Sequence, residues 1–293
     1  MTRFLLLVNP AAGGGRALDR LPTVEAELAR LGAEHRTVQT TDMRHAEDEA
    51  RAAAAAGETV AAMGGDGLLR PIVATLRDGG VPLAIIPGGR GNDYARVLGI
   101  SEDPVEAART AVEGRERLLD VAEVDGTPYM GIASFGFDSD ANRIANEARL
   151  VRGNLVYAYA AFRAMATWKH AGFTVTVDGE PHELSGFSVA VANSRAFGGG
   201  MFLAPQAELD DGVLDIVAIC GRSKLRYLRG LPGVFKGKHL DNPMVNVLRG
   251  SEIDVASDRP FVIYADGDPI GTTPATVTVE ARCLRVIVPP ATS

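Results

Sequence analysis

The chain has 293 residues, 46% of them hydrophobic and 23% charged, which suits one or two folded domains and excludes a disordered protein. Its net charge of -7 lacks the basic excess of nucleic-acid-binding domains, so we expect no nucleic acid partner. The two cysteines, Cys220 and Cys283, are not in a CxxC spacing, which excludes a disulfide framework and favours a reducing compartment. No apolar run is long enough for a signal peptide or a bilayer span, and we expect a cytoplasmic protein.

The first part of the chain alternates short apolar runs with helix-like patterns. The apolar run at 4–8 is typical of a strand buried on both faces, and a glycine-rich turn and a helix follow, with Pro22 near the helix start. Strands alternating with helices indicate βαβ units around a parallel sheet. The further expected strands are 35–40, 59–63 and 83–86, and the helices between them are 46–56 and 68–77.

After residue 118 the pattern changes to successive short strands separated by Asp-Gly turns, which favour hairpins. We therefore predict an α/β domain over 1–122 and a largely antiparallel β domain over 123–293, with the last strand, 282–289, a candidate to return to the first domain. The expected strands are 118–124, 128–134, 173–177, 187–192, 213–219, 245–248, 253–256, 261–265, 275–279 and 284–288, and the expected helices are 140–149, 154–170 and 223–236.

Three glycine-rich turns follow strands of the expected parallel sheet, at 9–15 (NPAAGGG), 64–67 (GGDG) and 87–93 (PGGRGND). Ligands bind at the carboxyl ends of such strands, where glycines let backbone N–H groups approach phosphate oxygens. Neither GxGxxG nor the Walker pattern is present, which argues against a Rossmann dehydrogenase and a P-loop ATPase. Asp66 in the second turn would repel a phosphate unless a divalent cation lies between them, so it suggests Mg²⁺ with a nucleotide. An Asp-Gly turn with no ligand is the alternative.

Together these motifs resemble the nucleotide-site motifs of the soluble bacterial diacylglycerol kinase family, which includes eukaryotic diacylglycerol, sphingosine and ceramide kinase domains. The resemblance spans essentially the whole chain and is nearest to the actinobacterial diacylglycerol kinases. In the second half it rests on Gly136-Phe137-Asp138, Asn193-Ser194-Arg195 with Gly198-Gly199-Gly200, Ala204-Pro205 with Asp210-Asp211-Gly212, and Ala265-Asp266-Gly267-Asp268.

The resemblance implies a phosphofructokinase-like α/β domain and a C-terminal β-sandwich with the nucleotide in the cleft between them. Asp66 would hold Mg²⁺ and the ATP phosphates, and Asp268 would act as general base on the lipid hydroxyl. A structural Mg²⁺ would bind near Asp211, with the backbone carbonyls of Glu208 and Val213 as further ligands. The nucleotide contacts implied are Asn9, Pro10, Gly13, Thr40, Gly64, Gly65, Asp66, Gly67, Gly89, Arg90, Gly91, Asn92 and Asp93.

The chain departs from the family pattern in three places. Leu68, Leu69 and Arg70 stand where Thr-x-Asn-Glu usually follows Gly-Gly-Asp-Gly, which removes polar groups beside the nucleotide. Arg90 replaces a Thr and adds a cation to the third loop, and Asp268 replaces a Glu.

We predict an ATP-dependent kinase that converts diacylglycerol to phosphatidic acid. The alternatives are a kinase of another lipid (sphingoid base, ceramide or monoacylglycerol), an NAD kinase, whose Asn-Glu pair would correspond to Asn146-Glu147, and a catalytically weak nucleotide- or lipid-binding paralogue.

Residues 222–238 carry six cations and no acid, interleaved with apolar residues, so they are a candidate for peripheral binding to an anionic membrane. A helix packed on the β domain is the other interpretation, and a homodimer is left open.

Overall fold

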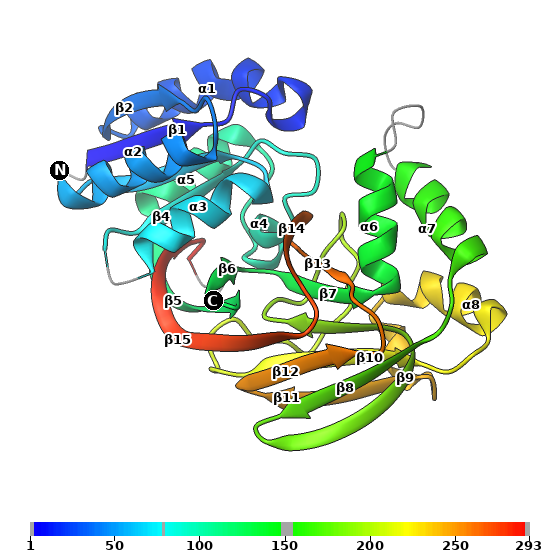
Figure 1. Ribbon diagram of the computed structural model, residues 1–293. Coiled ribbons are helices and arrows are strands. Elements are labelled where there is room, and N and C mark those ends of the chain that lie inside the picture. The colour runs from blue at the N-terminus through cyan, green and yellow to red at the C-terminus, as the bar shows by residue number, and fades with distance from the viewer. Residues whose placement is uncertain (1–2, 78–79, 148–154, 291–293) are drawn as a thin grey trace.

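The computed structural model describes residues 3–77, 80–147 and 155–290 and contains an α/β half followed by an antiparallel half (Figure 1). The helices are α1 (Arg16–Arg30), α2 (Met43–Ala55), α3 (Asp66–Leu76), α4 (Asp93–Val97), α5 (Pro104–Glu113), α6 (Phe137–Glu147), α7 (Leu155–Thr167) and α8 (Lys224–Val234), with 3₁₀ turns at Ala12–Gly14 and Lys238–Asp241. The strands are β1 (Arg3–Val8), β2 (Glu34–Gln39), β3 (Thr59–Gly64), β4 (Leu83–Pro87), β5 (Arg115–Val124), β6 (Thr127–Tyr129), β7 (Ile132–Gly136), β8 (Ala171–Val177), β9 (Glu180–Ala192), β10 (Leu214–Cys220), β11 (Val245–Gly250), β12 (Glu252–Ser257), β13 (Val262–Ala265), β14 (Asp268–Thr272) and β15 (Ala275–Val288).

The N-terminal half is built on the parallel strands β2-β1-β3-β4. The apolar runs of β1, β3 and β4 are buried throughout because helices cover both faces of the sheet, with α1 beside α5 and α2 beside α3. Since these strands are parallel, their carboxyl ends, and the three glycine-rich turns that follow them, lie at one edge of the sheet.

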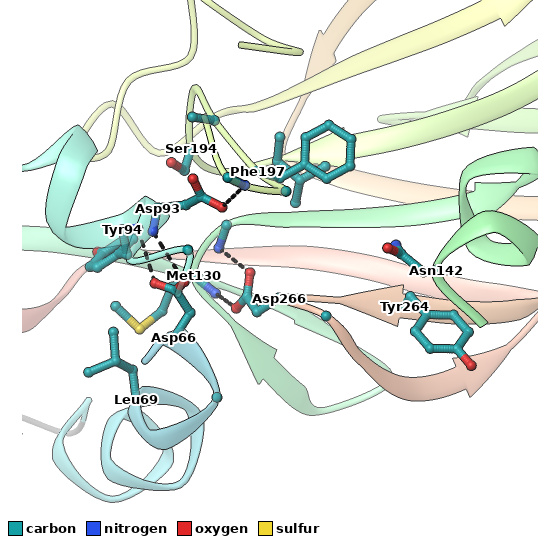
Figure 2. A pocket seen from close by; sticks show the side chains of 18 residues that line it. Asp66, Leu69, Asp93, Tyr94, Met130, Asn142, Ser194, Phe197, Tyr264 and Asp266 are labelled. Carbon is teal, nitrogen blue, oxygen red and sulfur yellow. Dashed lines mark hydrogen bonds between the residues drawn. The ribbon is translucent and has the colours of Figure 1, made fainter. Parts of the chain in front are cut away.

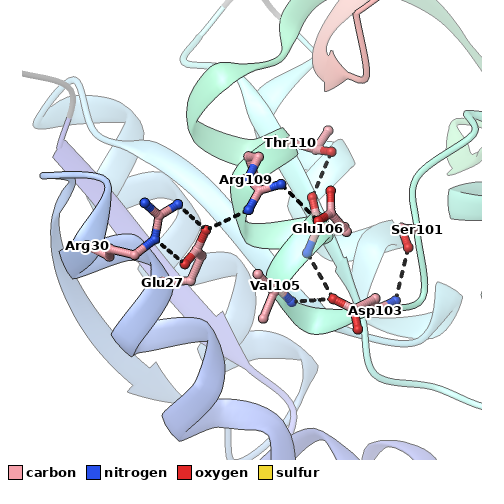
Figure 3. A network of polar contacts seen from close by, with 8 residues as sticks. All are labelled: Glu27, Arg30, Ser101, Asp103, Val105, Glu106, Arg109 and Thr110. Carbon is pink, nitrogen blue, oxygen red and sulfur yellow. Dashed lines mark hydrogen bonds and ion pairs between the residues drawn. The ribbon is translucent and has the colours of Figure 1, made fainter.

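Helices α1 and α5 are joined by a polar network at the surface (Figure 3). Glu27 accepts hydrogen bonds from Arg30 on its own helix and lies 3.5 Å from Arg109 of α5. These guanidinium groups lower the pKa of the Glu27 carboxyl. The side chain of Asp103 caps α5 by accepting the N–H groups of Val105 and Glu106, which fixes where that helix begins.

In the C-terminal half, antiparallel strands run in the order β14-β13-β7-β9-β8-β12-β15, and β10 and β11 extend from β9. The last strand, β15, pairs in parallel with β4 and antiparallel with β5, so it joins the two halves. Helices α6, α7 and α8 pack on this sheet through an aromatic cluster formed by Phe137, Trp168, Phe187 and Tyr227.

Several elements differ from the sequence expectations. Pro22 lies inside α1, because the helix begins directly after Gly15. The expected strand 128–134 is divided into β6 and β7, since the N–H groups of Met130 and Gly131 bond to the Asp266 carboxylate instead of to a strand. The two strands expected at 275–288 are one, β15, with an irregularity at Arg282, whose N–H donates to Asp120. Helices α4 and α5 and strand β14 were not expected.

Candidate active site

The second and third glycine-rich loops touch backbone to backbone. The Gly64 carbonyl accepts the N–H groups of Gly88 (2.7 Å) and Gly89 (3.0 Å). A Cβ placed on Gly89 would lie 2.4 Å from the Gly65 Cα, so neither loop could keep this position with a side chain at Gly89. The Asn92 side chain closes the third loop on itself by accepting the Gly89 N–H and donating to the Gly89 carbonyl.

The first loop joins the other two through Gly13. A Cβ there would lie 2.5 Å from the Gly88 carbonyl oxygen, and Gly13 has a left-handed φ of 64°. The Asn9 side chain orders this loop by accepting the Ala11 N–H at 3.0 Å. The Thr40 hydroxyl lies beside the end of β1 and already donates to the Val8 carbonyl, at 3.2 Å. The structure thus brings the three loops together, while the Arg90 side chain is exposed.

Asp66 begins α3 and faces the third loop. Its two carboxylate oxygens accept the N–H groups of Asp93 (3.1 Å) and Tyr94 (3.2 Å) at the start of α4. Burial raises the pKa of the Asp66 carboxyl, the Tyr94 N–H opposes this rise, and the charge of Asp93 adds to it. Asp66 is therefore a carboxylate held in place by backbone groups, in surroundings where a cation would stabilise its charge.

A second carboxylate, Asp266, enters from the C-terminal half at the turn between β13 and β14. It accepts the N–H groups of Met130 and Gly131, both at 2.9 Å. Burial raises the pKa of Asp266 to about 6 despite these hydrogen bonds, and the Asp66 charge contributes to the rise. Asp266 lies in the Ala-Asp-Gly-Asp motif, but sequence reasoning assigned the chemistry to Asp268 alone and missed it.

Between the two halves lies a cavity of about 190 Å³ (Figure 2). One wall carries Asp66 of the second glycine-rich loop, Asp93 of the third and Tyr94, which follows it. The opposite wall carries Asp266 together with residues of the β domain, among them the apolar Ile132 and Phe197. Three carboxylates therefore share one small space with an apolar surface, an arrangement that suits a cation-neutralised phosphate next to an apolar substrate.

Asp268, the expected general base, lies at the border of this cavity. Its Oδ2 lies 3.6 Å from Nη2 of Arg70. A Cβ placed on Gly67, which lines the cavity, would lie 3.7 Å from the same oxygen. The Asp268 side chain is 42% exposed and can reach solvent. Arg70, a departure from the family pattern, thus lies beside a second departure, Asp268. Leu68 and Leu69, which precede Arg70 and also depart from the family pattern, are buried in α3, and Leu69 lines the cavity.

At the expected structural Mg²⁺ site, the acidic side chains make other contacts, while the further ligands expected there are the backbone carbonyls of Glu208 and Val213. Asp211 accepts the Val213 N–H and forms an ion pair with Arg249, while Glu208 is about half exposed and lies 3.6 Å from Arg195. Within the described ranges, no three His, Cys, Asp or Glu side chains are grouped to hold a metal. A Mg²⁺ at Asp66 would therefore be held by one or two carboxylates together with phosphate oxygens, a common arrangement for this ion.

The side chains of Asn146 and Glu147, the pair considered for an NAD kinase, lie outside the described residues. Two other residues that line the cavity, Asn142 and Ser194, were not assigned to the site from the sequence. Ser194 belongs to the Asn-Ser-Arg motif, whose position before three glycines was the available signal.

Comparisons with known proteins give the family. Residues 3–124 match the diacylglycerol kinase catalytic domain, and residues 131–288 match the YegS C-terminal NAD kinase beta sandwich-like domain. A diacylglycerol kinase of Mycobacterium tuberculosis is 31% identical over 97% of this chain and 94% of its own length, and one of Bacillus subtilis is 27% identical over 99% and 97%.

A crystal structure of a diacylglycerol kinase from Bacillus anthracis superposes with a TM-score of 0.81 at 24% identity, covering 99% of this chain and 98% of that one. The predicted fold class, an α/β domain followed by a β-sandwich, is confirmed, as is the resemblance to the actinobacterial enzymes. The chain belongs to the diacylglycerol kinase family and is a kinase.

Proposed function

We propose that the protein transfers the γ-phosphoryl group of ATP to the free hydroxyl of diacylglycerol, which gives phosphatidic acid. The observation that carries this proposal is the cavity, in which Asp66, Gly67 and Gly91 of the second and third glycine-rich loops face an apolar wall of the β domain. The names of the relatives support the same lipid substrate.

The residues of the N-terminal half fit the nucleotide phosphates. Phosphoryl transfer depends on positioning and charge neutralisation more than on covalent catalysis. When bound, Mg²⁺ would neutralise phosphate charge next to Asp66. The close packing of Gly64 and Gly65 against Gly88 and Gly89 requires glycines, and it holds together the two loops that carry Asp66, Gly67 and Gly91 to the cavity.

Asp268 fits the role of general base better than Asp266 does. Both oxygens of Asp266 accept backbone N–H groups, whereas Asp268 is paired with a side chain, at 3.6 Å, and can turn toward a substrate hydroxyl. In the proposed step Asp268 takes the proton of the lipid hydroxyl while the hydroxyl oxygen bonds to phosphorus and ADP leaves. Arg70 would orient the Asp268 carboxylate.

Helix α8 and the residues after it are the proposed contact with an anionic membrane. Tyr227 and Val234 are buried against the β domain, while Leu225 (58% exposed) and Phe235 (55% exposed) lie on the surface. The side chains of Arg226 and Arg229 are also exposed. One face of this segment packs on the domain and the other combines cations with apolar side chains, which supports the proposed membrane contact. No helix in the described part of the chain is long and apolar enough to cross a bilayer.

The test is a substrate panel with labelled ATP and Mg²⁺. The acceptors are diacylglycerol, monoacylglycerol, ceramide, sphingosine and NAD, given to the wild-type protein, to Asp66→Asn and to Asp268→Ala. We expect labelled phosphatidic acid from the wild type and at least about a hundredfold lower rate from each variant. Asp254→Asn, at an exposed carboxylate of β12, is the matched control and should keep the wild-type rate. Labelling of no lipid would refute the proposal.

NAD kinase activity is the second candidate, because the β-sandwich matches a domain described as NAD kinase-like. Labelled NADP in the same panel, without labelled lipid, would select it.

A further inference from the structure

Ser194 is a fully buried residue with an unsatisfied hydroxyl. Its Oγ has no hydrogen-bond partner in the part of the chain that the structure describes, although the residue lines the cavity (Figure 2). The backbone holds Ser194 firmly, since the N–H groups of Asn193 and Ser194 both donate to the Gly131 carbonyl, at 2.9 and 3.1 Å. A buried polar atom without a partner costs free energy, so a ligand group in the cavity is the natural partner for this hydroxyl.

The turn that follows also exposes backbone to the cavity. Gly198, Gly199 and Gly200 have successive φ values of 60°, 83° and 100°, and the first two line the cavity. The Gly199 N–H donates to Asp93 at 2.8 Å, which joins this turn to the third glycine-rich loop. A Cβ on Gly200 would lie 3.2 Å from Nη1 of Arg96, so a guanidinium group adjoins the turn.

The groups that line the cavity therefore differ in charge. Asp66 and Asp266 supply only acceptor oxygens and require a cation or a proton beside a phosphoryl group, whereas Asp93 is already paired with Arg96 at 2.7 Å. Ser194 supplies an O–H donor close to the glycine turn and needs no cation. Phosphoryl oxygens are strong acceptors, and a hydrogen bond to a charged oxygen is about twice as strong as one between neutral groups.

We propose that the Ser194 hydroxyl, with the Gly198–Gly200 turn beside it, binds an oxygen of the phosphoryl group from the side of the β domain. The group can be the terminal phosphoryl of the nucleotide or the phosphomonoester of the lipid product. This inference rests on the proposed function for the identity of the lipid.

Binding measurements by calorimetry, with Mg²⁺ present, test the proposal without relying on turnover. The probes are a non-hydrolysable ATP analogue, dihexanoyl phosphatidic acid with ADP, and dihexanoylglycerol, which lacks the phosphate. In Ser194→Ala we expect the affinity for at least one phosphoryl-bearing probe to fall roughly tenfold, and the affinity for dihexanoylglycerol to stay unchanged. The probe that weakens identifies the source of the phosphoryl group. Unchanged affinity for both phosphoryl-bearing probes would overturn the proposal.

Thermal unfolding without ligand separates binding from a structural role. Ser194→Ala removes a hydroxyl that has no partner, so its unfolding midpoint should equal or exceed that of the wild type. Ser139→Ala is the matched control: this buried serine donates to the Ser134 carbonyl at 2.6 Å, so its loss should lower the midpoint and leave the probe affinities unchanged. A lower midpoint in Ser194→Ala with wild-type affinities would assign the hydroxyl to the fold and overturn the proposal.

The outcomes also separate this inference from the proposed function. If the wild type binds neither lipid probe but Ser194→Ala weakens the ATP analogue, the phosphoryl contact stands and the lipid kinase assignment fails. If the wild type phosphorylates diacylglycerol and Ser194→Ala binds every probe normally, the assignment stands and the contact is refuted.

Discussion

Asp266 offers a quantitative test of the cavity, because it couples protein stability to pH. Its pKa rises from 3.8 to about 6 in the folded protein, mainly through burial. The folded protein then binds more protons than the unfolded chain between these values, so its stability falls as the pH rises through this range. A shift of this size corresponds to a loss of about 3 kcal/mol over the full range, with roughly half of it between about pH 5 and about pH 8.

The assay is urea unfolding of the wild type and Asp266→Asn at several pH values, without nucleotide or metal. The variant cannot ionise at this position, so only the wild type should lose this part of its unfolding free energy as the pH rises. The unfolding free energy of the variant should therefore increase relative to that of the wild type. The lost hydrogen bond to Met130 or Gly131 adds a constant offset and does not change this slope. Asp254→Asn, on the surface of β12, should run parallel to the wild type. Parallel curves for Asp266→Asn as well would refute a buried, charge-coupled carboxylate in the cavity.

Three further predictions concern the loops, the general base and the membrane face. Gly89→Ala should raise KM for ATP at least about tenfold and lower stability by roughly 1–3 kcal/mol, because its Cβ would lie 2.4 Å from the Gly65 Cα; Gly230→Ala, whose Cβ meets only a side-chain atom at 3.4 Å, should do neither. Arg70→Gln should lower kcat several-fold with KM for ATP unchanged, and Arg70→Lys should restore part of the rate; equal kinetics for all three proteins would remove Arg70 from the positioning of Asp268. Replacing Arg226 and Arg229 together by Gln should weaken the free energy of binding to anionic vesicles, measured by sedimentation, by about 1 kcal/mol per charge, whereas Arg285→Gln should not change it. Lys224 is left out of this test because it donates to the Met165 carbonyl and joins α8 to α7.

The sequence predicted β1, β3 and β4 of the parallel sheet well because their apolar runs are buried on both faces, and burial alone determines such a pattern. The long strands of the β domain were harder to delimit. In β9 the first half is polar and partly exposed, so only the apolar second half was recognised. Helix α5 was missed although Asp103-Pro104 is a legible start signal, with a capping side chain and a proline in the first turn.

The three glycine loops could be predicted to meet, since parallel strands carry them to one edge. The contribution of the β domain could not. Asp266 and Ser194 reach the cavity through the pairing of β13 with β7 and through the Gly131 carbonyl, contacts between residues far apart in the sequence. The pairing of Arg70 with Asp268 could not be predicted either. The two residues are far apart in the sequence, and only the fold brings them to within 3.6 Å of each other.

The most direct test of lipid kinase activity is a competition assay in which diacylglycerol, in mixed vesicles, and NAD are offered together to the wild-type protein with Mg²⁺ and γ-labelled ATP. We expect the label to appear in phosphatidic acid and Asp66→Asn to abolish this transfer. Label in NADP alone, or in neither acceptor, would contradict it.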